Sequence, residues 1–122
     1  MTDSFALITG ASSGMGYCYA QQLAARGYQL LIVSNEPAIH EKAAVLRNEY
    51  SVQVVSLERD LSLPSAAQEL HQYCIDNQLE VEVLVNNAGV YHDRDFLLDS
   101  ERFNSLILNL HMYTPAMLCY YF

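Results

Sequence analysis

The stretch Phe5-Ala-Leu-Ile-Thr9-Gly10-Ala-Ser-Ser-Gly14-Met-Gly16 decides how this chain folds. Its first five residues predict a buried strand, its glycines a tight turn, and residues 15–26 a helix that ends before Gly27. Such a turn lets the backbone approach a phosphate while the first N–H groups of the helix point at the anion. The position between strand and helix therefore predicts a nucleotide-binding unit, although glycines alone mark many ordinary turns.

Three further apolar runs predict strands over residues 28–33, 51–57 and 80–86. The run over residues 30–33 is continuous, which is typical of a parallel strand covered on both faces. The strands alternate with helical segments and predict an α/β fold, a Rossmann-like doubly wound parallel sheet. We expect a partial sheet of about four strands in the order 3-2-1-4, with helices on both faces. Residues 1–122 would form one truncated dinucleotide-binding domain.

Capping residues predict where the other helices begin. Pro37 can open a helix that runs to about residue 50, and Ser62 can cap the next helix, in which Leu70 and Ile75 would face inward. After a loop, Asp99 or Ser100 can cap a long terminal helix.

The charge balance excludes some classes of partner. The chain has six basic and fourteen acidic residues, a formal net charge of −8, and Lys42 as its one lysine. Such a surface argues against binding to nucleic acid or to an anionic membrane. Backbone amides would have to hold any phosphate, because few cationic side chains are available.

The compartment is predicted from cysteines and from the absence of targeting segments. Three widely spaced cysteines predict free, mostly buried thiols in a reducing compartment. The N-terminus has no signal-peptide pattern, and no apolar run is long enough to span a membrane. We therefore expect a cytoplasmic protein. No metal site is expected, because metal-ligand spacing is not found among the histidines His40, His71, His92 and His111.

Two further motifs follow the third and fourth predicted strands. Asp60-Leu61 could present a carboxylate to an adenine amino group, although an aspartate near a helix start is also common in loops. Asn86-Asn87-Ala88-Gly89 would be taken for a turn on its own, but at the carboxyl end of a parallel strand it faces the ligand crevice.

These three motifs, in this order, resemble those of the short-chain dehydrogenase/reductase family. The segment Ser100–Leu110 also resembles the family helix that carries a catalytic-site asparagine, which falls on Asn109. The resemblance implies that the chain binds NAD or NADP. It implies cofactor contacts from Gly10, Ser12, Ser13, Gly14, Met15, Gly16, Asp60, Leu61, Asn87, Ala88 and Gly89.

The choice between the two cofactors stays open at this stage. An acidic residue after the second strand favours NAD by bonding the ribose 2′-hydroxyl, and an arginine there favours NADP. This chain has Ser34-Asn35-Glu36, in which the first two residues are uncharged and Glu36 comes late.

The family's chemistry also uses a serine and a Tyr-x-x-x-Lys pair, and the 122 residues contain no such pair. Lys42 is preceded four residues earlier by Ala38. We expect the N-terminal half of an NAD(P)-dependent oxidoreductase that transfers hydride between nicotinamide and an alcohol or carbonyl and is inactive alone. The alternative is a non-catalytic nucleotide-binding or self-associating module. The uncharged apolar residues 112–122 predict a homo-oligomer formed through the C-terminal helix.

Overall fold

The computed structural model describes residues 3–90 and 96–122. The strands are β1 Phe5–Thr9, β2 Gln29–Ser34, β3 Val54–Glu58 and β4 Val81–Val85. The α-helices are α1 Gly14–Ala25, α2 Ile39–Tyr50, α3 Ala66–Asp76, α4 Glu101–Leu108 and α5 Thr114–Tyr121. A 3-10 turn at Phe96–Leu98 precedes α4, and a π-helical turn at Asn109–Tyr113 joins α4 to α5.

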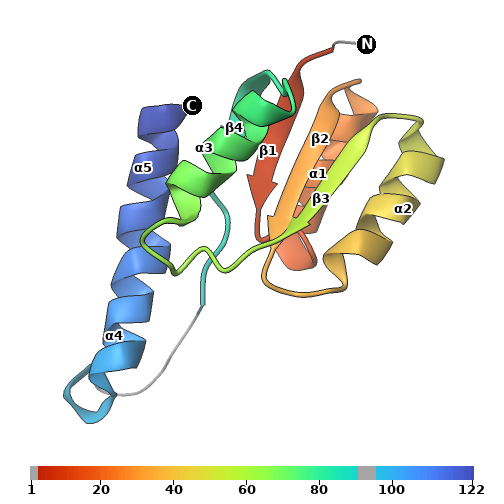
Figure 1. Cartoon of the computed structure of the whole chain (residues 1–122). Coiled ribbons are helices and arrows are strands. Elements are labelled where there is room, and N and C mark those ends of the chain that lie inside the picture. The colour runs from red at the N-terminus through yellow and green to blue at the C-terminus, as the bar shows by residue number, and fades with distance from the viewer. Residues whose placement is uncertain (1–2, 91–95) are drawn as a thin grey trace.

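The four strands form one parallel sheet in the order β3-β2-β1-β4 (Figure 1), which confirms the predicted order and fold class. β1 lies in the centre, with Leu7 beside Leu31 of β2 and Leu84 of β4. Because all strands run the same way, their carboxyl ends meet at one edge of the sheet. That edge carries the loops in which the sequence motifs lie.

Side chains of β1 alternate between two hydrophobic cores, one on each face of the sheet. Ala6 and Ile8 pack with the buried residues of α1 and α2, whereas Leu7 packs with those of α3 and with Leu118 of α5. Figure 1 shows the same arrangement, with the helices divided between the two faces. The prediction of helices on both faces is confirmed, and it explains why the strands are apolar on both sides.

Two of the predicted helix starts are wrong. α2 begins at Ile39 rather than at Pro37, because the peptide N–H of Ile39 donates to Glu36 O at 3.2 Å and closes a turn first. α3 begins at Ala66, and Ser62 does not cap it. The Ser62 hydroxyl instead donates to Asp60 Oδ1 at 2.6 Å, so it stabilises the loop before the helix.

Three other local expectations also need correction. β3 starts at Val54 rather than at residue 51, because Ser51 takes a left-handed conformation, with φ of 56°, that ends α2. Leu70 is buried as predicted, but Ile75 does not face inward and is 55 % exposed. The thiols are free but not mostly buried, since Cys18 and Cys119 are exposed.

The terminal helix is one continuous rod in Figure 1 but is not uniform. Ser100 caps it as predicted, with its hydroxyl accepting the N–H of Phe103 at 3.0 Å. The π-helical turn at Asn109–Tyr113 then interrupts the α-helical pattern. Such turns are uncommon and often lie near functional sites.

Candidate functional site

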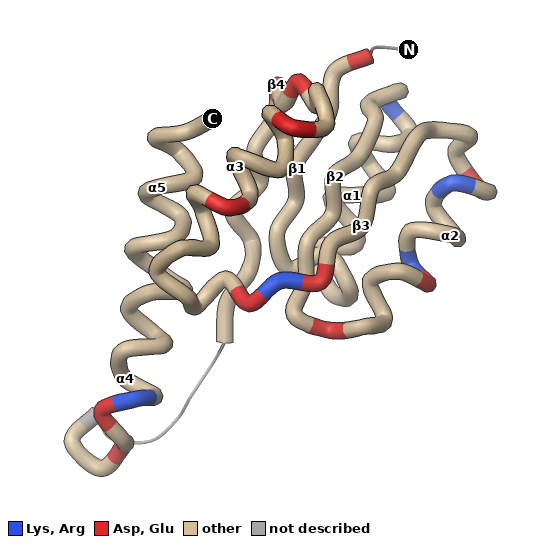
Figure 2. The backbone as a smooth tube through the Cα atoms, viewed as in Figure 1, with Lys and Arg blue, Asp and Glu red and all other residues tan. Residues whose placement is uncertain are grey.

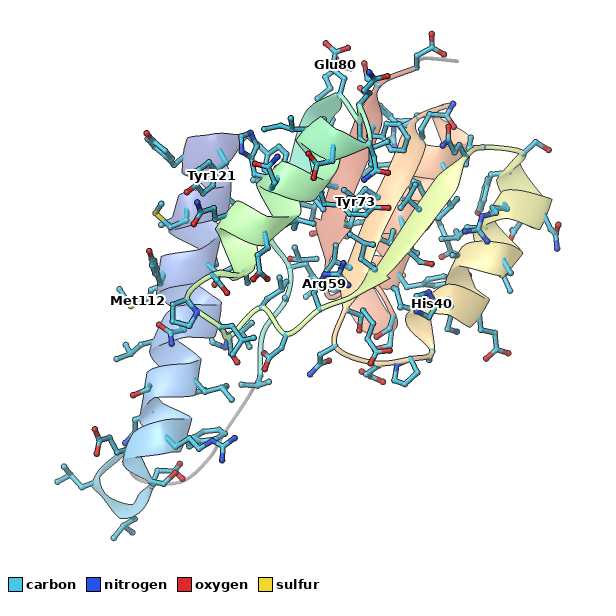
Figure 3. The ribbon with its side chains drawn as sticks, in the orientation of Figure 1. His40, Arg59, Tyr73, Glu80, Met112 and Tyr121 are labelled. Atoms are coloured by element: carbon cyan, nitrogen blue, oxygen red, sulfur yellow. The ribbon has the colours of Figure 1, made fainter. Side chains whose placement is uncertain are left out.

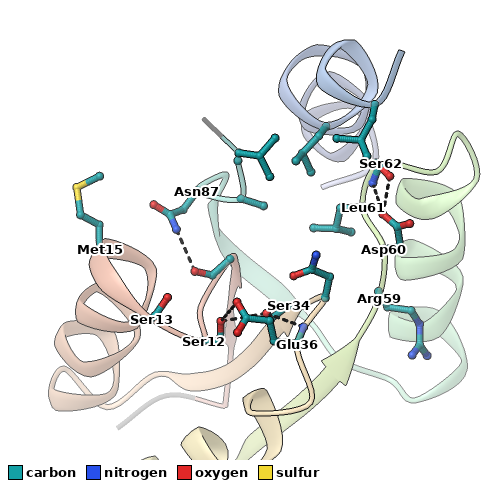
Figure 4. Close-up of a pocket in the computed structure, with 17 residues that line it drawn as sticks. Ser12, Ser13, Met15, Ser34, Glu36, Arg59, Asp60, Leu61, Ser62 and Asn87 are labelled. Atoms are coloured by element: carbon teal, nitrogen blue, oxygen red, sulfur yellow. Dashed lines mark hydrogen bonds between the residues drawn. The ribbon is translucent and has the colours of Figure 1, made fainter. Parts of the chain in front are cut away.

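The loops that follow the four strands meet around one pocket of about 350 Å³ at the carboxyl edge of the sheet (Figure 4). This volume lies within the range of small-molecule sites. Nine of the predicted residues line it: Gly10, Ser12, Ser13, Met15, Asp60, Leu61, Asn87, Ala88 and Gly89. The other lining residues are Ser34, Asn35, Glu36, Arg59, Ser62, Val90, Leu106 and Leu110.

Two glycines of the turn after β1 adopt left-handed backbone conformations. The φ angle is 64° at Gly10 and 57° at Gly14. A Cβ at Gly10 would lie 2.8 Å from Ala88 Cα, so the turn can approach the segment after β4 only with glycine there. A Cβ at Gly14 would meet nothing within 4 Å.

Gly16 lies beneath the turn rather than among the pocket residues. A Cβ there would lie 2.1 Å from Gly10 O and 2.5 Å from Asn87 Nδ2. The Asn87 amide donates to Gly10 O at 3.1 Å, so these three residues pack as one unit. Gly14 and Gly16 do not line the pocket, and their cofactor contacts stay predictions.

Thr9 joins the ends of β1 and β4, and the sequence reasoning did not single it out as a site residue. Its Oγ1 accepts the N–H groups of Asn87 and Ala88, each at 3.0 Å, and donates to Val85 O at 3.4 Å. Thr9 is buried, with 2 % of its surface exposed. A hydroxyl at the end of an otherwise apolar strand is the signal that could have identified it.

Three side chains form a hydrogen-bonded cluster at the ends of β1 and β2. Ser34 Oγ donates to Ser12 Oγ at 3.1 Å, and Ser12 Oγ donates to Glu36 Oε1 at 3.3 Å. The N–H of Glu36 donates to Ser34 Oγ at 3.1 Å. Both serines are buried, so they hold the exposed Glu36 carboxylate at the rim of the pocket.

The loop after β3 contributes residues of both charges. Asp60 Oδ1 accepts the Ser62 N–H at 3.0 Å as well as its hydroxyl, which fixes the carboxylate beside the pocket. Arg59 donates a guanidinium N–H to Glu58 O at 2.9 Å. Figure 2 shows this acidic–basic–acidic run at the end of β3. The lining thus has two acids and one base, and backbone N–H groups would have to counter any phosphate.

The terminal helix, made of α4, the π-helical turn and α5, forms another wall of the pocket. Leu106 and Leu110 line the pocket, whereas Asn109 is half-buried and does not. The catalytic role predicted for Asn109 therefore stays a prediction. Nearby, the Val90 N–H donates to His111 Nε2 at 3.1 Å, and a Cβ at Gly89 would lie 2.7 Å from the His111 ring.

Hydrogen bonds tie α5 to two of the strand-end loops. Thr114 Oγ1 donates to Leu61 O at 2.6 Å and is buried. Asn86 Nδ2 donates to Pro115 O at 3.3 Å. These contacts fix the pocket wall formed by the terminal helix relative to the sheet.

Within residues 3–90 and 96–122, no group of three or more His, Cys, Asp or Glu side chains could hold a metal ion. His92 lies outside the described residues. Among the described residues, no helix is both long and apolar enough to cross a membrane.

Comparisons with known proteins agree with this geometry. A family model described as short chain dehydrogenase matches residues 4–115. The very-long-chain 3-oxoacyl-CoA reductase-A of Danio rerio is 29 % identical over 113 residues, covering 88 % of this chain and 35 % of the reductase. The uncharacterized oxidoreductase YmfI of Bacillus subtilis is 35 % identical over 118 residues, 93 % of this chain and 46 % of the relative.

A solved structure gives the same match in space. The short-chain dehydrogenase from Sphingobium yanoikuyae, in complex with NADPH, is 29 % identical and superimposes with a TM-score of 0.88. The match covers 97 % of this chain and 46 % of that enzyme. This chain thus spans about a third to a half of the length of these relatives.

Proposed function

The chain belongs to the short-chain dehydrogenase family, and from that premise we propose that its pocket binds NAD or NADP. The observation that carries the proposal is the meeting of all four strand-end loops around one pocket, with the glycine turn and the start of α1 on one side. In doubly wound sheets, dinucleotides bind in the crevice at the carboxyl ends of the strands.

Each loop has a proposed contact with the dinucleotide. The turn over residues 10–16 would cradle the pyrophosphate with backbone N–H groups at the N-terminus of α1. Asp60 and Leu61 would contact the adenine, and residues 87–89 would lie along the ribose and the central part of the cofactor. The Thr9 and Asn87 hydrogen bonds support this arrangement, because they hold the first and last of these segments together.

Calorimetric titration of the 122-residue chain with NAD and NADP tests the proposal. The variant Ser13→Asp places a negative charge at the start of α1 inside the pocket, while aspartate remains a good N-cap residue. We expect it to weaken binding by about tenfold or more, or about 1.4 kcal/mol.

The matched control is Ser65→Asp, the same exchange at the N-cap of α3 outside the pocket, which should bind like the parent chain. Failure of the parent chain to bind either nucleotide, or equal weakening by both variants, would refute the proposal.

By family, the proposed reaction is hydride transfer between nicotinamide and an alcohol or carbonyl carbon. We propose that these 122 residues bind the cofactor without catalysing that reaction. The one lysine, Lys42, lies in α2 with its ammonium 4.9 Å from the centre of the Tyr17 ring, and Ala38 stands four residues before it. Turnover of any alcohol or ketone by the purified chain would contradict this.

Self-association is a second proposed property, favoured by the exposed apolar side chains on the terminal helix. Leu108, Met112 and Tyr120 are 52 %, 65 % and 78 % exposed, and Figure 3 shows Met112 on the outer side of this helix. Within the described residues, β4 pairs only with β1, so its other edge is open. We propose that a second copy of the chain covers this region.

Sedimentation velocity over a range of concentrations tests the self-association. Tyr120→Lys should shift the chain toward the monomer, because it places a charge among the exposed apolar side chains. Val45→Lys, at an exposed apolar residue of α2, which packs in the core on the other face of the sheet, is the control and should leave the association unchanged. A parent chain that stays monomeric at the highest concentration would rule the proposal out.

A further inference from the structure

The feature that goes beyond the proposed function is the fixed position of the Glu36 carboxylate. Glu36 is an exposed residue, yet its side chain is not free, because Ser12 Oγ donates to Oε1 at 3.3 Å. Ser12 in turn accepts from Ser34, and both serines are buried, with 6 % and 4 % of their surfaces exposed. The carboxylate is therefore held against the glycine turn instead of extending into solvent.

Doubly wound folds that bind a dinucleotide hold its adenosine ribose near the same place. In doubly wound folds that ribose lies between the glycine turn and the end of the second strand, and an acidic residue about 20 residues beyond the turn bonds its 2′-hydroxyl. Glu36 follows the last glycine of the turn, Gly16, at this spacing. Its hydrogen bond to Ser12 brings it back to this position, although it stands two residues beyond the end of β2.

Among the described residues, no cationic side chain is positioned to receive a 2′-phosphate at the same place. Arg59 is the one basic residue among those that line the pocket in the described chain. Its guanidinium donates to Glu58 O at 2.9 Å, and Figure 4 shows the side chain directed away from Ser12 and Glu36. A phosphate monoester carries a charge of about −1.5 to −2 at neutral pH, so it would face the carboxylate as a like charge.

We propose that Glu36, held by Ser12 and Ser34, makes this pocket select NAD over NADP. The inference rests on the proposed dinucleotide binding and adds a cofactor preference to it. A preference for NAD would distinguish this chain from the Sphingobium yanoikuyae dehydrogenase, whose structure is in complex with NADPH. We expect NAD to bind about tenfold tighter than NADP or better.

Calorimetry with NAD and NADP on the parent chain and on Glu36→Gln tests the inference. Glutamine keeps an oxygen that can accept the Ser12 hydrogen bond but removes the charge. The ratio of the NADP to the NAD dissociation constant should therefore fall toward one, mainly because NADP binds more tightly. The pair 5′-AMP and 2′,5′-ADP repeats the comparison on the ribose end alone. Glu41→Gln is the control, since it removes one exposed carboxylate of α2 outside the pocket and should leave the preference unchanged.

The possible results separate the inference from the proposed function. Binding of NADP as tightly as NAD, or more tightly, overturns the inference and leaves dinucleotide binding intact. If Arg59→Gln then weakens NADP alone, Arg59 rather than Glu36 sets the preference. An NAD preference that survives Glu36→Gln overturns the role of Glu36. Failure of both nucleotides to bind overturns the proposed function and the inference with it.

Discussion

Replacing Gly16 by alanine should damage the pocket by disturbing the turn above it. The added Cβ would lie 2.1 Å from Gly10 O and 2.5 Å from Asn87 Nδ2. The nearer atom belongs to the backbone, so rotation of a side chain cannot relieve the contact. α1 or the glycine turn must shift, and the hydrogen bond from Asn87 to Gly10 O is then strained or lost.

The expected cost follows from two opposing effects. Overpacking of this kind costs about 1–3 kcal/mol, and so close a contact with backbone belongs at the upper end. Alanine is a better helix former than glycine by about 1 kcal/mol in a helix interior, and by less at a third helical position. The free energy of unfolding should therefore fall by about 2 kcal/mol. For 122 residues, an unfolding entropy of about 2.1 cal/mol/K per residue converts this to a drop in Tm of about 8 °C.

Thermal unfolding followed by circular dichroism measures this change. The control is Gly14→Ala, whose Cβ would meet nothing within 4 Å and whose cost arises only from the left-handed φ of 57°, about 1 kcal/mol. The order of Tm should be parent, then Gly14→Ala, then Gly16→Ala. An unchanged or raised Tm for Gly16→Ala would show that helix propensity dominates and that α1 does not pack against Gly10 as described.

Three further predictions concern buried polar groups. Thr9→Val leaves two backbone N–H groups without their acceptor and should lower the free energy of unfolding by about 2 kcal/mol or more in urea titrations, and a change below about 0.5 kcal/mol would contradict the bonding described. Thr114→Val removes the buried bond that ties α5 to the loop after β3 and should cost about 1–3 kcal/mol, with loss of nucleotide affinity measured by calorimetry; unchanged stability would argue against this tie. Burial raises the pKa of the Cys74 thiol to about 11, so the neutral thiol stabilises the fold below the unfolded pKa of about 8.5, and this contribution is lost as pH rises toward 11. Urea titrations from pH 8 to 11 should show this decline in the parent chain and a shallower one in Cys74→Ala, and equal slopes would disprove the assignment.

The strands could be predicted because apolar runs and glycines are strong local signals, and their order follows from the doubly wound topology that alternating strands and helices indicate. Phe5–Thr9 and Gln29–Ser34 are buried along almost their whole length, and a continuous apolar run records that burial directly. Helix starts were predicted less well. Pro37 and Ser62 are both suitable for a first turn, but each lies in a turn closed by hydrogen bonds before its helix begins. Nothing in the identity of either residue distinguishes the two positions.

Most of the pocket could be predicted from motifs, whereas its connecting residues could not. The predicted loops after β1, β3 and β4 all line the pocket. Thr9 and Ser34 were not predicted to take part, because their roles depend on hydrogen bonds between segments far apart in the chain. The position of the Glu36 carboxylate likewise depends on Ser12, which no spacing rule reveals.

The central claim is that the loops at the carboxyl edge of the sheet bind a nicotinamide dinucleotide. The most direct test follows backbone amide signals by two-dimensional NMR while NAD is added to the isotopically labelled 122-residue chain. The account predicts saturable shifts that gather at residues 10–16, 34–36, 59–62 and 87–90. Shifts confined to α3 and the end of α5, or no shifts at millimolar NAD, would contradict it.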